Sequence, residues 1–348
     1  MISRAIVKGS FTVVMVLIFT AGISVPDAES RQRRCKGRVL NSAKELRAIN
    51  GASNRTFCIA SSSSKPTGAF EIGKRVLRPG NNLTLIGVRV RKRPDGYGHR
   101  YAIKAPSKIH GTGPAIIDLG GKHTITIRNL DLSGARGSCS SKHDGTVVTR
   151  GVNLKISNSR VHHGFAQAIG HSSGGIFRHL EIDHNGAECL GSRTSGGIKT
   201  GSSRGYTISH SYVHNNVGPG IWCDASCDNF RVLRNVSVHN SGQGIRYEHG
   251  LHAGLCDSCE AIIRYNLVKK NGLKSFDLDR ANAGIGVSSS ANVVIAFNRL
   301  GRNYNRNGIY LQDGRHPLQN IRIHDNVLGG DKIKSCSKVG VRCSTNNK

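Results

Sequence analysis

Short runs of aliphatic residues recur along the chain from Thr124 onward, each followed by Asn or His and, in every copy but the last, by a second Asn, His or Gly five positions later. The copies open at Asn129, Asn158, His179, His210, Asn235, Asn266, Asn298 and Asn326. The second positions are Gly134, His163, His184, Asn215, Asn240, Asn271 and Asn303. Successive openings lie between 21 residues (158 to 179) and 32 residues (266 to 298) apart. Such a period is typical of stacked supersecondary units.

A second short strand follows in each copy and begins with a small residue and isoleucine. These pairs are Ala168-Ile169, Gly197-Ile198, Gly220-Ile221, Gly244-Ile245, Gly284-Ile285 and Gly308-Ile309. Short strands separated by Gly, Asn and Ser fit a coil of β-segments and turns. Each coil contacts only its neighbours, so one solenoid can be long. The pattern predicts an all-β parallel β-helix of about eight or more coils.

The recurring asparagines have a structural explanation. Asn tolerates left-handed backbone geometry and can bond to its own turn. Stacked about 4.8 Å apart, the amides can also bond to one another, and His can partly substitute. We therefore predict no catalytic role for this column.

The ends of the chain predict export and capping. Arg4 and Lys8 precede an apolar run over residues 11–23, so residues 1–28 are predicted to be a signal peptide. That run is shorter than the roughly 20 residues of a membrane span, so we expect no membrane association. Residues 29–75 are expected to form a basic arm and a short capping helix, opened by a Ser42–Glu45 capping box. The β-helix is expected over 76–330, with a C-terminal cap or tail over 331–348.

Ten cysteines in an exported chain indicate disulfides. Short separations favour three pairs, and two long-range pairs remain. The candidates are Cys223/Cys227, Cys256/Cys259, Cys336/Cys343, Cys35/Cys58 and Cys139/Cys189. The connectivity stays open at this point, and Cys256–Cys259 also has the spacing of half a zinc site or a redox pair.

The formal net charge is +29, which becomes +28 if Arg4, Lys8 and Asp27 are removed with the signal peptide. Such a surface attracts polyanions. Export and the absence of a nucleic-acid-reading motif argue against nucleic acid. We expect a secreted, extracellular or periplasmic monomer whose partner is an acidic polysaccharide or another extracellular polyanion. High charge as a means of solubility is the competing explanation.

Four segments carry a resemblance to a known family: Gly196–Lys199, His214–Asp224, Gly244–Glu248 and Gly284–Ser288. With the repeats, they make residues 76–330 resemble the right-handed β-helix repeat proteins of the pectate-lyase-like superfamily. The resemblance implies that the chain is a right-handed parallel β-helix with a pectin-lyase-like fold. It also implies a carbohydrate-active protein. That superfamily includes lyases, hydrolases, epimerases and non-catalytic binders, so the resemblance assigns no active-site residue.

Alignment of the second strands at their inward isoleucines predicts an outward face. The first outward position holds Gly170, Lys199, Trp222, Arg246, Gly286 and Tyr310, and the second holds Ser172, Gly201, Asp224, Glu248, Ser288 and Gln312. Titratable and aromatic side chains gather here, and Gly286 leaves room for a sugar ring. Three unusually long connections, 179–198, 245–266 and 266–285, are expected to wall a cleft around this face.

Three functions remain open for this face. In a polysaccharide lyase, Lys199 or Arg246 would act as base or charge clamp, Asp224 and Glu248 would hold Ca²⁺, and Tyr310 would donate a proton. A glycoside hydrolase would use Asp224 and Glu248 as its carboxylate pair. A non-catalytic glycan binder would use Trp222, Tyr310 and Gln312 as contacts.

The lyase is favoured because the neighbouring cations offset the repulsion between the carboxylates. Two further interpretations remain. In the first, the column serves only as a cation–aromatic stack without function. Off this face, His162, Asp183, His214 and His239 align and suggest a metal site, although turn-capping histidines are favoured.

Overall fold

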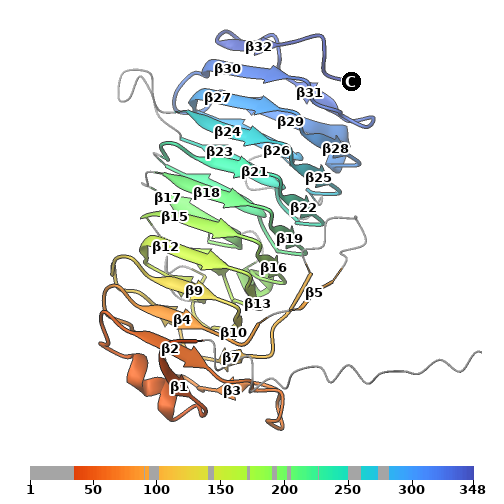
Figure 1. The fold of residues 1–348 in the computed structure, drawn as a ribbon. Coiled ribbons are helices and arrows are strands. Elements are labelled where there is room, and N and C mark those ends of the chain that lie inside the picture. Colours follow the sequence, from red (N-terminus) through yellow and green to blue (C-terminus); the bar gives the residue numbers. More distant parts are fainter. Residues whose placement is uncertain are drawn as a thin grey trace, which may run out of the picture.

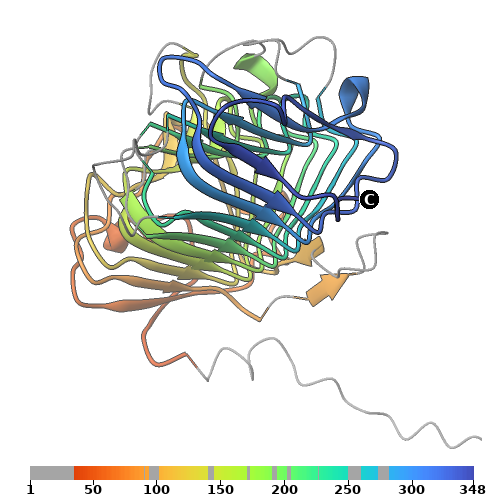
Figure 2. The same ribbon diagram turned by 90° about the horizontal axis from the view of Figure 1, so that it is seen from above.

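The computed structural model describes residues 35–89, 91–93, 102–139, 145–170, 173–189, 194–201, 205–225, 227–249, 260–272 and 282–348. Over these residues the chain winds into a stack of coils, with β1 near one end and β32 at the other (Figure 1). Seen along the stack, successive coils superimpose on three sides around a common interior (Figure 2). The predicted parallel β-helix is confirmed.

Three parallel sheets form these sides. Sheet A, the longest, has 12 strands in the described residues and runs the whole length of the stack. Its strands are β1 (Arg38–Leu40), β2 (Thr56–Ile59), β4 (Thr84–Ile86), β9 (Thr126–Arg128), β12 (Val152–Ser157), β15 (Ser173–Arg178), β18 (Tyr206–Ser209), β21 (Arg231–Leu233), β24 (Ala261–Arg264), β27 (Ala291–Ala296), β30 (Gln319–His324) and β32 (Val341–Cys343).

Sheets B and C complete each coil. Sheet B contains β3 (Phe70–Glu71), β7 (Lys108–Gly111), β10 (Asp131–Gly134), β13 (Arg160–His162), β16 (Glu181–Asp183), β19 (Tyr212–His214), β22 (Val236–Val238), β25 (Leu267–Lys269) and β28 (Arg299–Gly301). Sheet C contains β8 (Ala115–Asp118), β11 (Thr146–Thr149), β14 (Gln167–Gly170), β17 (Gly196–Gly201), β20 (Ile221–Asp224), β23 (Ile245–Glu248), β26 (Ile285–Ser288), β29 (Asn307–Gln312) and β31 (Lys332–Lys334).

An antiparallel hairpin, β5 (Arg91–Arg93) and β6 (Ala102–Lys104), stands outside this stack. Its Ile103 is buried and donates its backbone N–H to the Glu181 carboxylate on sheet B, 2.5 Å away. The hairpin therefore covers part of the outer face of sheet B.

The interior consists of aliphatic columns. On sheet C the isoleucines stack in register from coil to coil and are fully buried: Ile169, Ile198, Ile221, Ile245, Ile285 and Ile309. These are the inward residues that the sequence alignment selected, so the predicted register of the second strands is confirmed. Buried aliphatic surface contributes roughly 25 cal/mol per Å², which makes these columns the main source of cohesion between coils.

Turn residues in a left-handed conformation separate sheet A from sheet B. They are Asn129, Asn158, His179, His210, Arg234, Tyr265, Phe297 and Asp325, with φ between 48° and 60°. The sequence alignment placed Asn235, Asn266, Asn298 and Asn326 in this column, and that placement is wrong by one residue. These four residues follow the left-handed position and are buried.

The buried asparagines form two ladders through their side-chain amides. One runs Asn235, Asn266, Asn298, Asn326 and Asn347, and the other runs Asn185, Asn216, Asn240, Asn271, Asn303 and Asp331. Each Asn also donates to a backbone carbonyl, as Asn266 does to Val232. The predicted structural role of stacked amides is thus seen in both ladders.

Both ends of the stack differ from the predicted boundaries. Sheet A begins at Arg38 and reaches Cys343, so the coils extend beyond residues 76–330 in both directions. The N-terminal cap is a 3₁₀ helix, η1 (Glu45–Ile49), whose Leu46 and Ile49 are buried. Ser42 Oγ accepts the N–H of Glu45 at 3.2 Å, as a capping box requires. Two further 3₁₀ turns are η2 (Ala187–Cys189) and η3 (Tyr304–Arg306).

Four of the expected disulfides are present: Cys35–Cys58, Cys139–Cys189, Cys223–Cys227 and Cys336–Cys343. Such bonds are typical of exported proteins. Cys256 and Cys259 lie outside the described residues, as does the expected signal peptide over 1–28. Among the described residues, no helix is both long and apolar enough to cross a membrane.

Candidate functional site

The outer face of sheet C carries the predicted column of polar and aromatic side chains. Gly170, Lys199, Trp222, Arg246, Gly286 and Tyr310 are partners in register on six successive strands. Gly201, Asp224, Glu248, Ser288 and Gln312 form a second column two residues further along each strand. Ser172 lies outside the described residues. The structure thus places the predicted site residues on one face.

Trp222 is held between two cations. The Lys199 Nζ lies 3.6 Å and the Arg246 guanidinium carbon 4.8 Å from the centre of the indole ring. The side chain points outward, as its register requires, but only 2% of Trp222 is exposed. Trp222 is therefore buried although it points outward, because alternation along a strand fixes only the direction of a side chain and the long side chains of adjacent coils decide its exposure.

Each of the two carboxylates is paired with a cation. Lys199 Nζ lies 2.9 Å from Asp224 Oδ2, and the Arg246 Nε contacts Glu248 Oε2. Burial lowers the pKa of Lys199, although the neighbouring Asp224 opposes that shift. Lys199, Arg246 and Glu248 are buried, whereas 30% of the Asp224 side chain is exposed. A calcium ion on Asp224 and Glu248 would compete with these cations, and Ca²⁺ remains a prediction.

A cavity of about 240 Å³ opens where the column has its glycine. Of the described residues, its lining combines two aromatic rings, a guanidinium, two carboxylates, two amides and an imidazole: Trp222, Tyr310, Arg246, Asp224, Glu248, Gln243, Gln312 and His249. Gly286 lies in the floor, and a Cβ built on it would meet Gln243 Cγ at 3.1 Å. The predicted gap between Arg246 and Tyr310 therefore exists.

The described lining of the cavity differs from the predicted site in two respects. Lys199 is absent from it, because Lys199 lies on the far side of Trp222. Arg246, on the coil after Trp222, lines the cavity instead. Gln243 and His249 line it, yet sequence reasoning missed both. They flank strand β23 on either side, where the isoleucine alignment assigns no direction. The expected long loops fall largely on 190–193, 250–259 and 273–281, outside the described residues.

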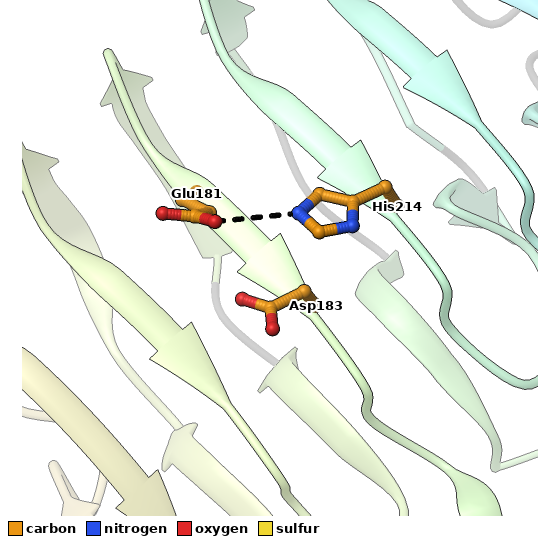
Figure 3. Close-up of side chains that lie close together, drawn as sticks. All are labelled: Glu181, Asp183 and His214. Carbon is orange, nitrogen blue, oxygen red and sulfur yellow. Dashed lines mark hydrogen bonds and ion pairs between the residues drawn. The ribbon is translucent and has the colours of Figure 1, made fainter. Parts of the chain in front are cut away.

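The histidine column predicted away from this face needs one correction. His162, Asp183 and His214 are partners in register on sheet B, but their next partner is Val238. His239 is the following residue and has a left-handed backbone, with φ of 57°. The alignment was one residue out in that coil. Glu181 joins Asp183 and His214 instead (Figure 3).

Comparison with protein families decides the classification. A model described as "Right handed beta helix region" matches residues 115–300, which is more than half of the chain. The chain belongs to the right-handed β-helix family. The match covers His162, His214 and the cavity residues from Trp222 to Ser289, whereas Tyr310 and Gln312 lie beyond it.

Three solved structures are similar to this chain. The A-module of a mannuronan C-5 epimerase from Azotobacter vinelandii is 13% identical, with 85% of each chain covered and a TM-score of 0.50. An alginate lyase from Paenibacillus sp. is 12% identical over 82% of this chain and 86% of the lyase, with a TM-score of 0.47. An endo-xylogalacturonan hydrolase from Aspergillus tubingensis is 13% identical over 84% of both chains, with a TM-score of 0.46. A search of curated proteins found no match.

Proposed function

We propose that this protein acts on an acidic, uronate-containing polysaccharide in the sheet C cavity and cleaves it by β-elimination. The observation that carries the proposal is the cavity itself, where Arg246 and two aromatic residues surround the space above Gly286. Flat apolar rings suit the faces of sugars, and a guanidinium can bind a carboxylate bidentately. The epimerase named for mannuronan gives one example of a polysaccharide substrate on this fold.

The size of the cavity suits one sugar unit of a longer polymer. At about 240 Å³ it is smaller than the roughly 300–1,000 Å³ of pockets that enclose drug-sized ligands. The rest of the polymer would run along the outer face of sheet C. The net charge of +29 would attract such a polyanion over long range.

The lining supplies the groups that β-elimination needs. A base removes the proton beside the uronate carboxylate, the bond from the neighbouring carbon to the glycosidic oxygen breaks, and a carbon–carbon double bond forms. In the proposal, Arg246 holds the substrate carboxylate and stabilises the enolate. His249 takes the proton, since a neutral imidazole is an effective base near neutral pH. Tyr310 protonates the departing oxygen.

Lys199 then has a positioning role. Its ammonium group lies against Trp222 and Asp224, so it fixes both side chains at the edge of the cavity. This replaces the expectation that Lys199 is one of the candidates for base or charge clamp. Glycoside hydrolysis by Asp224 and Glu248, neighbours in register, is less well supported, because both carboxylates face cations and neither is set apart as the acid.

The test compares variants on a panel of acidic and neutral polysaccharides. Arg246→Ala and Gly286→Phe should each lower turnover at least about 100-fold, one by removing the charge clamp and the other by filling the cavity. Arg128→Ala, exposed on sheet A, and Arg91→Ala, on the distant hairpin, are the controls and should retain most activity. Unsaturated uronate products are expected.

The alternatives give different results in the same assay. New reducing ends without unsaturated uronate would mean hydrolysis, and binding without turnover would mean a non-catalytic glycan binder. Equal turnover in all four variants would remove the cavity as the site. If calcium takes part, chelation should abolish turnover and added Ca²⁺ should restore it.

A further inference from the structure

A second cluster of titratable groups lies on the outer face of sheet B, away from the sheet C cavity. Glu181 and Asp183 flank the inward Ile182 on β16, and His214 pairs in register with Asp183 on the next coil (Figure 3). All three residues are buried, and Asp183 completely so. Burial of outward-facing charges is costly unless they are paired or bind a cation.

The cluster has more carboxylates than strong cations. Asp131 is buried two coils before the buried Glu181 and Asp183. Arg160, on the coil between them, is the guanidinium that pairs with Glu181 and Asp183 among the described residues. Arg160 binds both oxygens of Asp183, at 2.8 and 2.6 Å, and lies 3.9 Å from Glu181. His162 lies 2.7 Å from Asp131. These three carboxylates therefore outnumber the one guanidinium beside them, although the whole chain carries +29.

We propose that Glu181, Asp183 and His214 bind a divalent zinc-type metal ion. One ligand atom from each lies within 4.8 Å of the others, and His214 Nε2 is already 3.4 Å from Glu181 Oε1. A tetrahedral Zn²⁺ site with bonds of about 2.1 Å needs separations of about 3.4 Å, so the side chains must close in by at most about 1.4 Å. One imidazole with two carboxylates suits Zn²⁺, whereas Ca²⁺ prefers oxygen alone.

Neighbouring groups hold the three ligands in place. Asn215 Nδ2 lies 3.1 Å from His214 Nδ1. Rotation of this amide by 180° would bring its oxygen to the ring, where it would accept from Nδ1–H and leave Nε2 for the metal. His184 and Arg160 orient Asp183, whose carboxylate has enough lone pairs to bind a metal as well. Ile103 N–H binds Glu181 Oε2, which leaves Oε1 free to turn toward the ion.

The metal would fasten the β5–β6 hairpin to the coils. Glu181 connects the two, since one of its oxygens accepts from the hairpin and the other is a metal ligand in the proposal. Binding should therefore stabilise the folded chain by an amount that rises with the logarithm of its affinity, because only the folded state brings the ligands together. The site is independent of the proposed polysaccharide chemistry, and its test needs no enzymatic activity.

The experiment measures Zn²⁺ binding by calorimetry to the whole exported chain after metal removal with EDTA. We expect about one equivalent to bind with a rise in Tm. Asp183→Asn and His214→Gln should each weaken binding by at least about 100-fold, since loss of a ligand should exceed the 10–100-fold cost of losing an outer-shell partner. His163→Gln, exposed, and His239→Gln, one coil away, are matched controls and should bind as the wild type does.

Two results would overturn the proposal. One is less than about a tenth of an equivalent bound by the wild type. The other is equal affinity in His214→Gln and His239→Gln, which would assign the ion to surface histidines. If Asp183→Asn fails to fold, His214→Gln decides. Loss of polysaccharide cleavage in Gly286→Phe with unchanged Zn²⁺ binding would separate the two sites.

Discussion

Trp222 illustrates, at the scale of the residue, how side chains of neighbouring coils control exposure. The register directs the indole outward from sheet C, and the cations of the preceding and following coils cover its two faces. Each cation–aromatic contact is worth about 0.5–1 kcal/mol at an exposed site and more when desolvated. The stack therefore provides a rigid wall for the cavity.

Fluorescence tests this arrangement, because Trp222 is the only tryptophan in the chain. We expect acrylamide to quench the wild type weakly, since 2% of the residue is exposed. Lys199→Ala should increase quenching at least about twofold by uncovering one ring face, at a cost of about 1–2 kcal/mol in unfolding free energy. Lys334→Ala, whose ammonium lies over Tyr310 instead, is the matched control. Strong quenching of the wild type would contradict a buried indole.

Asp118 gives a pH-dependent prediction at the same scale. Burial alone would raise its pKa, but hydrogen bonds from Arg150 and Gly120 outweigh burial and hold the pKa below its ordinary value. The unfolded chain therefore binds the proton first as the pH falls, so the stabilisation is full above about pH 5 and is lost as the pH falls through the folded pKa. Asp118→Asn should lower the unfolding free energy by about 1–2 kcal/mol at pH 7.

Chemical denaturation at several pH values checks this sign. The difference between wild type and Asp118→Asn should shrink below about pH 4. Asp313→Asn is the control, since 44% of the Asp313 side chain is exposed and its pair with Lys338 should contribute less than about 1 kcal/mol. A difference that grows in acid would contradict the assignment.

At the scale of the element, the sequence predicts the strands of sheet C better than the turns. Isoleucines at matching positions specify that sheet, because a shift of one residue would turn the polar column into the interior of the coils. The turn between sheets A and B places Tyr265 in the left-handed position and Asn266 in the interior. Asn occurs at both of these positions in different coils, so the sequence alone does not tell the two positions apart. Only coil-to-coil hydrogen bonds distinguish them.

Periodicity likewise predicts only part of the candidate sites. The column from Lys199 to Tyr310 follows from periodicity, whereas the cavity depends on Gln243 and His249 at positions that periodicity does not direct. The sheet B cluster was found only in part, because Glu181 lies two residues before the column that contains Asp183. Its burial depends on a hairpin more than 70 residues earlier in the chain, at Ile103.

Asn266 tests the ladder as an element. Its amide donates to the Val232 carbonyl and to Asn298, both at 2.9 Å, and its oxygen accepts the backbone N–H of Asn235 at 2.9 Å. Asn266→Ala would leave several buried groups unpaired, at about 1–3 kcal/mol each. We expect the unfolding free energy to fall by about 3–5 kcal/mol in chemical denaturation.

The neighbouring turn residue provides the control. Tyr265 is 52% exposed and has a φ of 60°, a conformation that Asn tolerates better. Tyr265→Asn should change the unfolding free energy by less than about 1 kcal/mol. Similar losses in Asn266→Ala and Tyr265→Asn would show that the ladder bonds are not what stabilises the turn.

At the scale of the whole molecule, the chain forms a long stack of coils (Figures 1 and 2). It combines a strongly positive net charge with a small cavity on sheet C. The two features act at different ranges. The net charge of +29 governs how fast a polyanion arrives, and the contacts of the cavity govern how long one of its units stays. Added salt should therefore distinguish the effect of the net charge from that of the cavity contacts, because it screens the long-range field more than it weakens contacts in a partly buried site.

Binding kinetics with a soluble polyuronate, measured between 0.1 and 1 M salt, give the last prediction. The Debye length falls from about 10 Å to 3 Å over this range, so kon should drop at least about tenfold while koff changes little. Gly286→Phe should raise koff and keep the salt dependence of kon, because it fills the cavity and leaves every charge in place. A neutral polysaccharide of similar length is the control and should show little salt dependence. If Gly286→Phe binds the polyuronate as tightly and for as long as the wild type, the polymer is held by the general charge of the surface and the cavity takes no part.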